Sequence, residues 1–259
     1  MVLNNPADKK TKKKFKLPAK SIKAAAEKPT PDAREQLFNE GLTGTVQDVQ
    51  VSAARITQVR GLMYDVDPAL LKPGGALGEI PLVPAELYGK VIKPMLARNP
   101  VLAKAEVRNS GTGLHVILRF DQPYQCDTDA AREEIAKVAE AVFFLLPYDP
   151  LQPGITALTR AVGSRNSKTG AIIKRLTPGE PVTYAEVRNL AVQFLASPLA
   201  MLCEVLFGSD RISPCPVCRH PGSTLVVVPH CGTCYACGKV TITHLWSELY
   251  QPRKGGLDG

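Results

Sequence analysis

The stretch Gly61-Leu62-Met63-Tyr64-Asp65-Val66-Asp67-Pro68 joins an apolar run to two acidic residues and a proline. A short apolar run bounded in this way is typical of a β-strand, and we expect the strand to span 56–66. Residues i and i+2 of a strand face the same side, so Asp65 and Asp67 would converge at its end. Two fixed carboxylates suit a divalent cation that takes oxygen ligands. A solvated turn is the alternative.

A glycine-containing loop lies further along the chain, in Ser110-Gly111-Thr112-Gly113-Leu114-His115. The flanking segments 103–108 and 114–120 have the pattern of two strands, and the residues between them favour a turn, so we expect a β-hairpin. The glycines would let the backbone come close to an anion. His115 would lie on the second strand, either as a site residue or as a buried core histidine.

A third polar region runs from Tyr148-Asp149-Pro150 to the loop at 160–170. Asp149 supplies another carboxylate. The loop offers three basic side chains that could bind phosphate: Arg160, Arg165 and Lys168. Its glycine spacing differs from that of a P-loop, which excludes nucleotide hydrolases of that class. A polar hairpin loop is the alternative interpretation.

Helical patterns alternate with these strands. Apolar spacing predicts helices over 84–98, from residue 127 or 128 to 146, and over 184–195. Thr183 and Glu186 form a capping box at the start of the last helix. Two further strands are expected at 155–162 and 171–176. The mixture predicts an α+β fold.

Five of the seven cysteines lie within 23 residues near the C-terminus. Cys215, Cys218, Cys234 and Cys237 follow a C-x2-C…C-x2-C pattern that is typical of a structural zinc site. Strand-like runs at 225–228 and 240–243 complete the expected zinc ribbon. Cys231 also forms a C-x2-C pair with Cys234 and is the alternate ligand, while His220 and His230 are weaker candidates.

Charge is distributed unevenly along the chain. The formal net charge is +8, and residues 1–28 carry +7 of it through nine lysines and two acidic residues. A basic balance points to a polyanionic partner such as nucleic acid. No apolar run approaches the ~18 residues of a membrane span, and no secretory signal is visible. With clustered cysteines, we expect a cytoplasmic protein without a membrane partner.

Composition divides the chain into four parts. We expect a disordered basic tail at 1–33, because few apolar residues are available there to offset the entropy of ordering. The catalytic domain would span 34–210, the zinc ribbon 211–248, and a flexible tail 249–259. The ribbon is too small to fold on apolar burial alone, so its metal would hold it together.

The order of the three polar regions resembles that of one known family. Asp-x-Asp, then Ser-Gly-x-Gly-x-His, then an acid after an apolar residue, then Arg-x-x-Gly-Ser-x-Asn-x-Lys-Thr-Gly, is similar to the archaeo-eukaryotic primase superfamily. The closest similarity is to primase-polymerase domains of bacterial mobile elements, plasmids and phages, over residues 55–176. The resemblance implies an RRM-like antiparallel sheet with flanking helices, followed by a zinc module.

The resemblance also implies roles for the residues. Asp65, Asp67 and Asp149 would hold two Mg²⁺ or Mn²⁺ ions, and His115 would hydrogen-bond an incoming triphosphate. The remaining nucleotide-binding candidates are Ser110, Gly111, Gly113, Arg160, Arg165, Asn166 and Lys168. Arg108 and Arg119 of the hairpin would bind phosphate or face water. In the zinc module, Trp246 would offer a stacking surface to the template.

The leading hypothesis is therefore a template-dependent nucleotidyltransferase, a DNA primase that could also extend primers as a polymerase. Its partners would be single-stranded DNA, nucleoside triphosphates and a separate replicative helicase. One alternative is a catalytically idle nucleic-acid-binding replication initiator or zinc-ribbon regulator. A second alternative is an end-joining or repair polymerase that uses the same site.

Overall fold

The computed structural model describes residues 56–150, 154–156, 159, 162–166 and 169–251. Its larger sheet has four antiparallel strands in the order β1-β3-β2-β4. These strands are β1 (Gln58–Val66), β2 (Glu106–Asn109), β3 (Leu114–Gln125) and β4 (Arg175–Thr177). The expected β1 strand and the β2–β3 hairpin are both confirmed. The expected basic tail at 1–33 lies outside the described residues.

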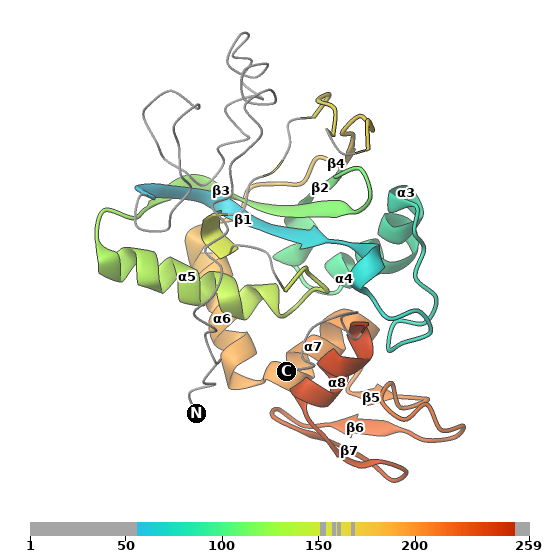
Figure 1. The fold of residues 1–259 in the computed structure, drawn as a ribbon. Helices are drawn as coiled ribbons and strands as arrows, with labels where there is room; N and C mark the ends of the chain where they lie inside the picture. Colours follow the sequence, from blue (N-terminus) through green and yellow to red (C-terminus); the bar gives the residue numbers. More distant parts are fainter. Residues whose placement is uncertain (1–55, 151–153, 157–158, 160–161, 167–168, 252–259) are drawn as a thin grey trace, which may run out of the picture.

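The two faces of this sheet differ in what they carry. Tyr64 of β1 points to the helical side, where its hydroxyl donates to the Val142 carbonyl of α5 (Asp129–Phe143) at 2.9 Å and its ring packs against Phe143. Met63 and Ile117, from alternate positions, form a small apolar cluster apart from the main core. Figure 1 shows α5 and α6 (Tyr184–Ala196) on one side of the sheet. The other face bears the polar residues considered below.

Local sequence explains where the main helices begin and end. Thr128 caps α5 by accepting from the Ala131 amide, and Thr183 and Glu186 form the expected capping box of α6. After α6 the chain turns into α7 (Pro198–Phe207), which ends at Gly208 in a left-handed conformation.

The length and apolarity of the helices indicate whether one of them could span a membrane. In the described part, no single helix is long and apolar enough to do so. Only α6 and α7 taken together have the length and apolarity, and they are bent by 112°.

The helix expected at 84–98 is present but interrupted. It consists of α3 (Pro84–Leu87), a π-helical turn η4 (Tyr88–Ile92) and α4 (Lys93–Ala97). Pro94 has no amide hydrogen to donate to the preceding turn, which accounts for the break in regular α-helical hydrogen bonding. The segment still buries its apolar face in the core.

Three expected strands differ in the structure. Residues 102–104 form the 3-10 helix η5 (Leu102–Lys104) before β2 begins. The strand expected at 155–162 begins instead with η6 (Gly154–Thr156), and its residues 157, 158, 160 and 161 lie outside the described residues. Of the strand expected at 171–176, only residues 175 and 176 belong to β4 (Arg175–Thr177). The described residues of 163–173 pair only through an isolated antiparallel bridge between Arg165 and Ile172, with the Gly163 amide donating to the Ile173 carbonyl at 2.9 Å.

The C-terminal module contains a second antiparallel sheet, in the order β5-β6-β7-β8. Its strands are β5 (Arg211–Ile212), β6 (Leu225–Val227), β7 (Gly232–Cys234) and β8 (Gly238–Val240). The strand expected at 240–243 ends at Val240, because Thr241 caps α8 (Ile242–Leu249). In Figure 1, α7 and α8 lie between the larger sheet and this module.

The predicted α+β class is confirmed. The molecule contains antiparallel sheets, with helices flanking the larger one and a small cysteine-bearing sheet after it. Apolar residues of both parts belong to one core cluster, which includes Leu245 and Leu249 of α8 as well as Cys215. The cysteine module is therefore packed onto the body of the protein.

Candidate functional site

A row of polar residues crosses the face of the larger sheet that is turned away from α5. Directly opposite one another stand Asp65 on β1, His115 on β3, Arg108 on β2 and Arg175 on β4. The His115 Nε2 atom lies 4.0 Å from Asp65 Oδ1, and its Nδ1 atom is 2.8 Å from the buried Thr159 hydroxyl. Asp65 keeps 41% of its side chain exposed, whereas His115 is buried. The two residues predicted separately from the sequence thus form one pair.

Beside this pair, Glu106 accepts hydrogen bonds from three arginines that lie on three different strands. Its Oε1 atom accepts from Arg108 Nε at 2.5 Å and from Arg175 Nε at 3.2 Å, and its Oε2 atom accepts from Arg119 Nε and Nη2 at 2.9 and 2.8 Å. Glu106 and Arg108 are almost fully buried. Burial alone would raise the pKa of Glu106, but the hydrogen bonds from Arg108 and Arg119 outweigh it and lower the pKa.

The other two acidic residues flank Asp65 in different ways. The Asp149 amide donates to the Asp65 carbonyl at 2.6 Å, so the third predicted acid lies next to the first. Asp67 caps the 3-10 helix η3 (Pro68–Leu70) by accepting from the Ala69 amide at 2.9 Å. Among the described residues, these three acids do not form a group of ligand atoms within 4.8 Å of one another.

The glycine loop packs against the end of β1 and against the second loop. A side chain at Gly113 would meet the Val66 carbonyl at 2.2 Å, so only glycine fits there. Asn166 Nδ2 donates to the Ser110 carbonyl at 2.6 Å and sits where a side chain at Gly111 would lie. The structure therefore brings together four of the predicted residues from the two loops: Ser110, Gly111, Gly113 and Asn166.

The basic residues of the second loop are described only in part. Arg165 is exposed, and its guanidinium donates to the Gly170 carbonyl at 3.0 Å, which closes its own loop. Arg160 and Lys168 lie outside the described residues. Their predicted contact with phosphate stays a prediction.

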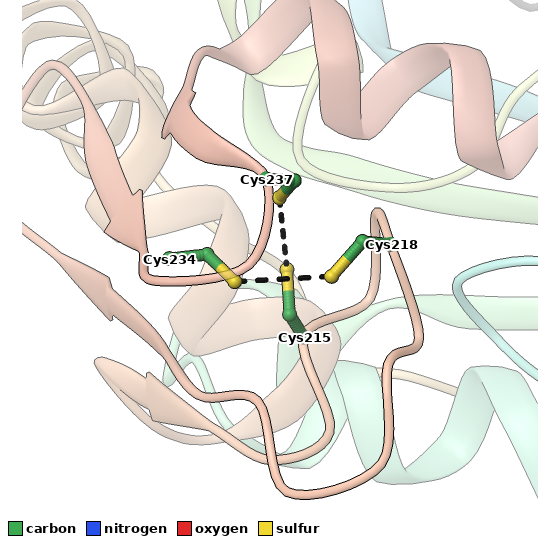
Figure 2. Close-up of side chains that lie close together, drawn as sticks. All are labelled: Cys215, Cys218, Cys234 and Cys237. Carbon is green, nitrogen blue, oxygen red and sulfur yellow. Dashed lines mark hydrogen bonds between the residues drawn. The ribbon is translucent and has the colours of Figure 1, made fainter.

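In the second candidate site, four sulfur atoms converge. Cys215, Cys218, Cys234 and Cys237 place their sulfurs within 4.8 Å of one another, with Cys215–Cys237 at 3.9 Å and Cys218–Cys234 at 3.8 Å (Figure 2). A tetrahedral zinc ion with bonds of about 2.3 Å requires sulfurs about 3.8 Å apart. The cluster could therefore hold a metal ion, and all four cysteines are free thiols.

Hydrogen bonds to these sulfurs favour thiolates. The His220 amide and the Ser223 hydroxyl lower the pKa of Cys218 to about 6. The Ala236 amide donates to the Cys234 sulfur at 3.4 Å. Desolvation and the neighbouring sulfurs raise the pKa of Cys237 to about 12, because four adjacent thiolates repel one another unless a cation compensates their charge.

Other candidates of this module lie apart from the cluster. Cys231 is not one of the four grouped residues, and neither is His220 nor His230. Trp246, which we expected to offer a stacking surface, is instead packed inward. It stacks on Tyr250 with ring centroids 5.1 Å apart and meets Phe144 and Tyr148 edge-on.

The buried base of the first site is not evident from the sequence alone. Glu106 and Arg175 received no role, and Arg108 was expected at the surface as readily as in the site. The alternation of residues along the hairpin strands could have indicated this site, because Glu106, Arg108, His115 and Arg119 all point to one face of the sheet. A charged residue at such alternate positions of a buried strand needs a partner.

Comparisons with known proteins give limited information. No family model and no curated protein matches the chain. Among solved structures, the AEP domain of the primase-polymerase of cyanophage S-2L is similar at 15% identity and a TM-score of 0.41, over 68% of this chain and 77% of that domain. A likeness this distant does not bear on activity, substrate or metal ions.

Proposed function

We propose that this protein is a template-dependent nucleotidyltransferase, a DNA primase that joins nucleotides on single-stranded DNA and can extend them. The observation that carries the proposal is the site around Asp65. An exposed carboxylate stands opposite a buried histidine, with the Asp149 amide hydrogen-bonded to the same strand end and a glycine loop beside it.

The acidic side chains around Asp65 are of the chemical type that binds a hard divalent cation. Asp65, Asp67 and Asp149 supply carboxylate oxygens, which are the ligands that Mg²⁺ and Mn²⁺ prefer. Asp65 is reachable from solvent, and Asp149 is held beside it by a backbone hydrogen bond. When bound, two such ions would lower the pKa of a primer hydroxyl and neutralise charge on the leaving pyrophosphate.

The chain's own residues would position the nucleotide. His115, whose ring is oriented by the Thr159 hydroxyl, would donate a hydrogen bond to a phosphate oxygen near Asp65. Ser110 and the backbone of Gly111 and Gly113 would line the phosphates, and Asn166 would hold that loop in place through the Ser110 carbonyl. Arg160, Arg165 and Lys168 would neutralise the phosphates of nucleotide or template.

The four grouped cysteines would hold a structural zinc ion. Four sulfur ligands fill a tetrahedral coordination sphere and leave no open position for catalysis. The ion would therefore stabilise the ribbon, which in turn would help to hold the template. Residues 1–28, with their charge of +7, would add attraction to nucleic acid that weakens with salt.

The test is nucleotide incorporation on unprimed single-stranded DNA with Mg²⁺ or Mn²⁺, for the parent and an Asp65→Ala, Asp67→Ala double variant. Loss of the cation ligands should lower synthesis by more than about 1000-fold. Asp121→Ala is the matched control, because this acid is exposed at the far part of β3 and its carboxylate accepts from the amide of its neighbour Gln122.

Other outcomes assign the protein differently. Undiminished synthesis by the double variant would refute the proposed site. If the parent binds DNA but incorporates no nucleotide, the protein is a binding factor or regulator. A strong preference for recessed or broken ends over unprimed strands would assign it to end joining or repair.

A further inference from the structure

We propose that Tyr250, at the end of the helix that leaves the cysteine module, is a positioning residue for Asp149. This inference rests on the proposed function for its catalytic meaning, since Asp149 matters only if the acids bind a cation. Its structural content, a clamp on the Tyr148–Asp149 peptide, can be tested on its own.

One peptide unit is held at both ends. The Tyr250 hydroxyl donates to the Tyr148 carbonyl at 2.8 Å, and the Asp149 amide donates to the Asp65 carbonyl at 2.6 Å. This carbonyl and this amide belong to the same planar peptide group. The plane from which the Asp149 side chain projects is therefore fixed between β1 on one side and the end of α8 on the other.

Tyr250 is itself held firmly. Its ring stacks on Trp246, and Trp246 meets the Tyr148 ring edge-on with centroids 5.8 Å apart. Burial raises the pKa of Tyr250 far above its ordinary value, so the hydroxyl remains protonated and available as a donor. The donor is thus fixed in both position and protonation state.

The same segment also holds the chain that follows Asp67. The Gln251 amide donates to the Leu70 carbonyl at 2.9 Å, and the Lys72 amide donates to the Leu249 carbonyl at 2.9 Å. The Gln251 side chain reaches the Leu71 carbonyl at 2.9 Å. Residues 249–251 therefore contact both the segment after Asp67 and the segment before Asp149.

A charged contact links this arrangement to the cysteines. Arg219, the residue directly after Cys218, donates to the Glu248 carboxylate of α8 and to the Gly74 carbonyl. Lys72 donates to the same carboxylate at 2.8 Å. Arg219 therefore connects the first cysteine turn to α8. Tyr250, directly after α8, connects that helix to the Tyr148–Asp149 peptide.

A merely structural role for Tyr250 predicts something different. If the residue only adds packing, Tyr250→Phe keeps the ring and should leave the Asp149 amide and cation binding unchanged. If the hydroxyl positions Asp149, losing one hydrogen bond should loosen that peptide without unfolding the protein. A hydrogen bond of ordinary strength corresponds to a change of about threefold to tenfold.

The experiment compares the full-length parent, Tyr250→Phe and Tyr88→Phe. Tyr88 is a partly buried core tyrosine whose hydroxyl has no partner among the described residues, which makes it a matched control. Amide exchange at Asp149 is followed by NMR, and Mn²⁺ affinity by titration. The Asp65→Ala, Asp67→Ala double variant identifies the Mn²⁺ ions bound at the acids.

We expect Tyr250→Phe to exchange the Asp149 amide about threefold to tenfold faster and to bind Mn²⁺ correspondingly more weakly, with Tyr88→Phe unchanged in both. Unchanged exchange at Asp149 in Tyr250→Phe would overturn the inference, as would faster exchange with unaltered Mn²⁺ affinity at the acids. If the parent binds no Mn²⁺ at Asp65 and Asp67, the proposed function fails, while faster exchange in Tyr250→Phe would still establish the clamp.

Discussion

The two candidate sites are built in opposite ways. The four cysteines come from two turns within 23 residues, and their spacing alone predicts which sulfurs meet. The acid site draws on Asp65, His115, Asp149 and Asn166, which span about a hundred residues and meet only through strand pairing and loop packing. Local geometry makes the first site, and tertiary structure makes the second.

This difference has an energetic counterpart. The larger sheet is supported by a buried apolar core and by charged partners such as Glu106 and Arg108. The strands of the cysteine module are only two or three residues long, and short strands of this kind are not stable alone. We therefore expect the module to depend on its metal and the sheet on its packing, and four predictions test this contrast.

The largest effect is expected from loss of a cysteine ligand. Cys215→Ser should abolish zinc binding and unfold the module, since structural zinc contributes about 10–16 kcal/mol to the folding of small zinc domains. Zinc content by elemental analysis and the fluorescence of the single tryptophan, Trp246, report the loss. Cys231→Ser is the control and should keep its zinc, because Cys231 is outside the sulfur cluster. Zinc loss in the control instead would make Cys231 a ligand.

A smaller but substantial effect is expected in the larger sheet. Glu106→Gln removes the negative charge that three arginines share, one of which is the fully buried Arg108. Breaking such a buried pair should lower the free energy of unfolding by about 3–5 kcal/mol, measured by urea denaturation.

Glu133→Gln is the matched control for Glu106→Gln. It breaks an exposed ion pair with Lys137 on α5 and should cost less than about 1 kcal/mol. Equal losses in the two variants would mean that burial of the Glu106 network contributes nothing.

Overpacking at the glycine loop should have a smaller effect. Gly113→Ala would press a methyl group into the Val66 carbonyl, which we expect to cost about 1–3 kcal/mol. The counterpart is Gly89→Ala on η4, where a methyl group meets nothing within 4 Å; it should be neutral or stabilising by up to about 1 kcal/mol. Thermal unfolding of both variants checks this, and a neutral Gly113→Ala would show that the loop is not packed against β1.

The smallest effect concerns acid pH. The hydrogen bond from Lys104, together with those from Thr183, lowers the pKa of Glu186 to about 2. A carboxyl whose pKa is lower in the folded state stabilises the protein fully above about pH 4.5 and loses that contribution as pH falls towards 2. Glu186→Gln should therefore flatten the decline in urea midpoint between pH 4.5 and 2. An unaltered pH profile would contradict the role of this capping carboxylate.

Several elements were predictable because their signals are local. The β1 strand, the hairpin, the capping box of α6 and the two cysteine pairs each depend on residues within one short window. The structure also confirms the α+β class. In each of these places the apolar pattern, the turn residues and the capping residues indicate the same element. A structure can be predicted from the sequence where such local signals agree.

The remaining features depend on distant contacts. The partner of Asp65 was not deducible, because register across strands decides that His115 stands opposite it. Glu106 was missed because the three arginines that justify its burial arrive from different strands. Trp246 was expected at the surface because its neighbours in sequence do not reveal Phe144 and Tyr148, whose rings it meets edge-on.

The pairing of residues 249–251 with residues 69–72 also has a consequence for biosynthesis. The Gln251 side chain bonds to carbonyls 180 and 182 positions earlier in the chain. During translation the β1 strand with Asp65 therefore emerges long before the residues that hold the neighbouring segments. Contacts of such sequence separation form late in folding, so a nascent chain can complete its first sheet while the Asp149 peptide still lacks its second anchor. Residues 249–251, the last of the described chain to be synthesised, thus complete the hydrogen bonds of residues 69–72, which are synthesised early.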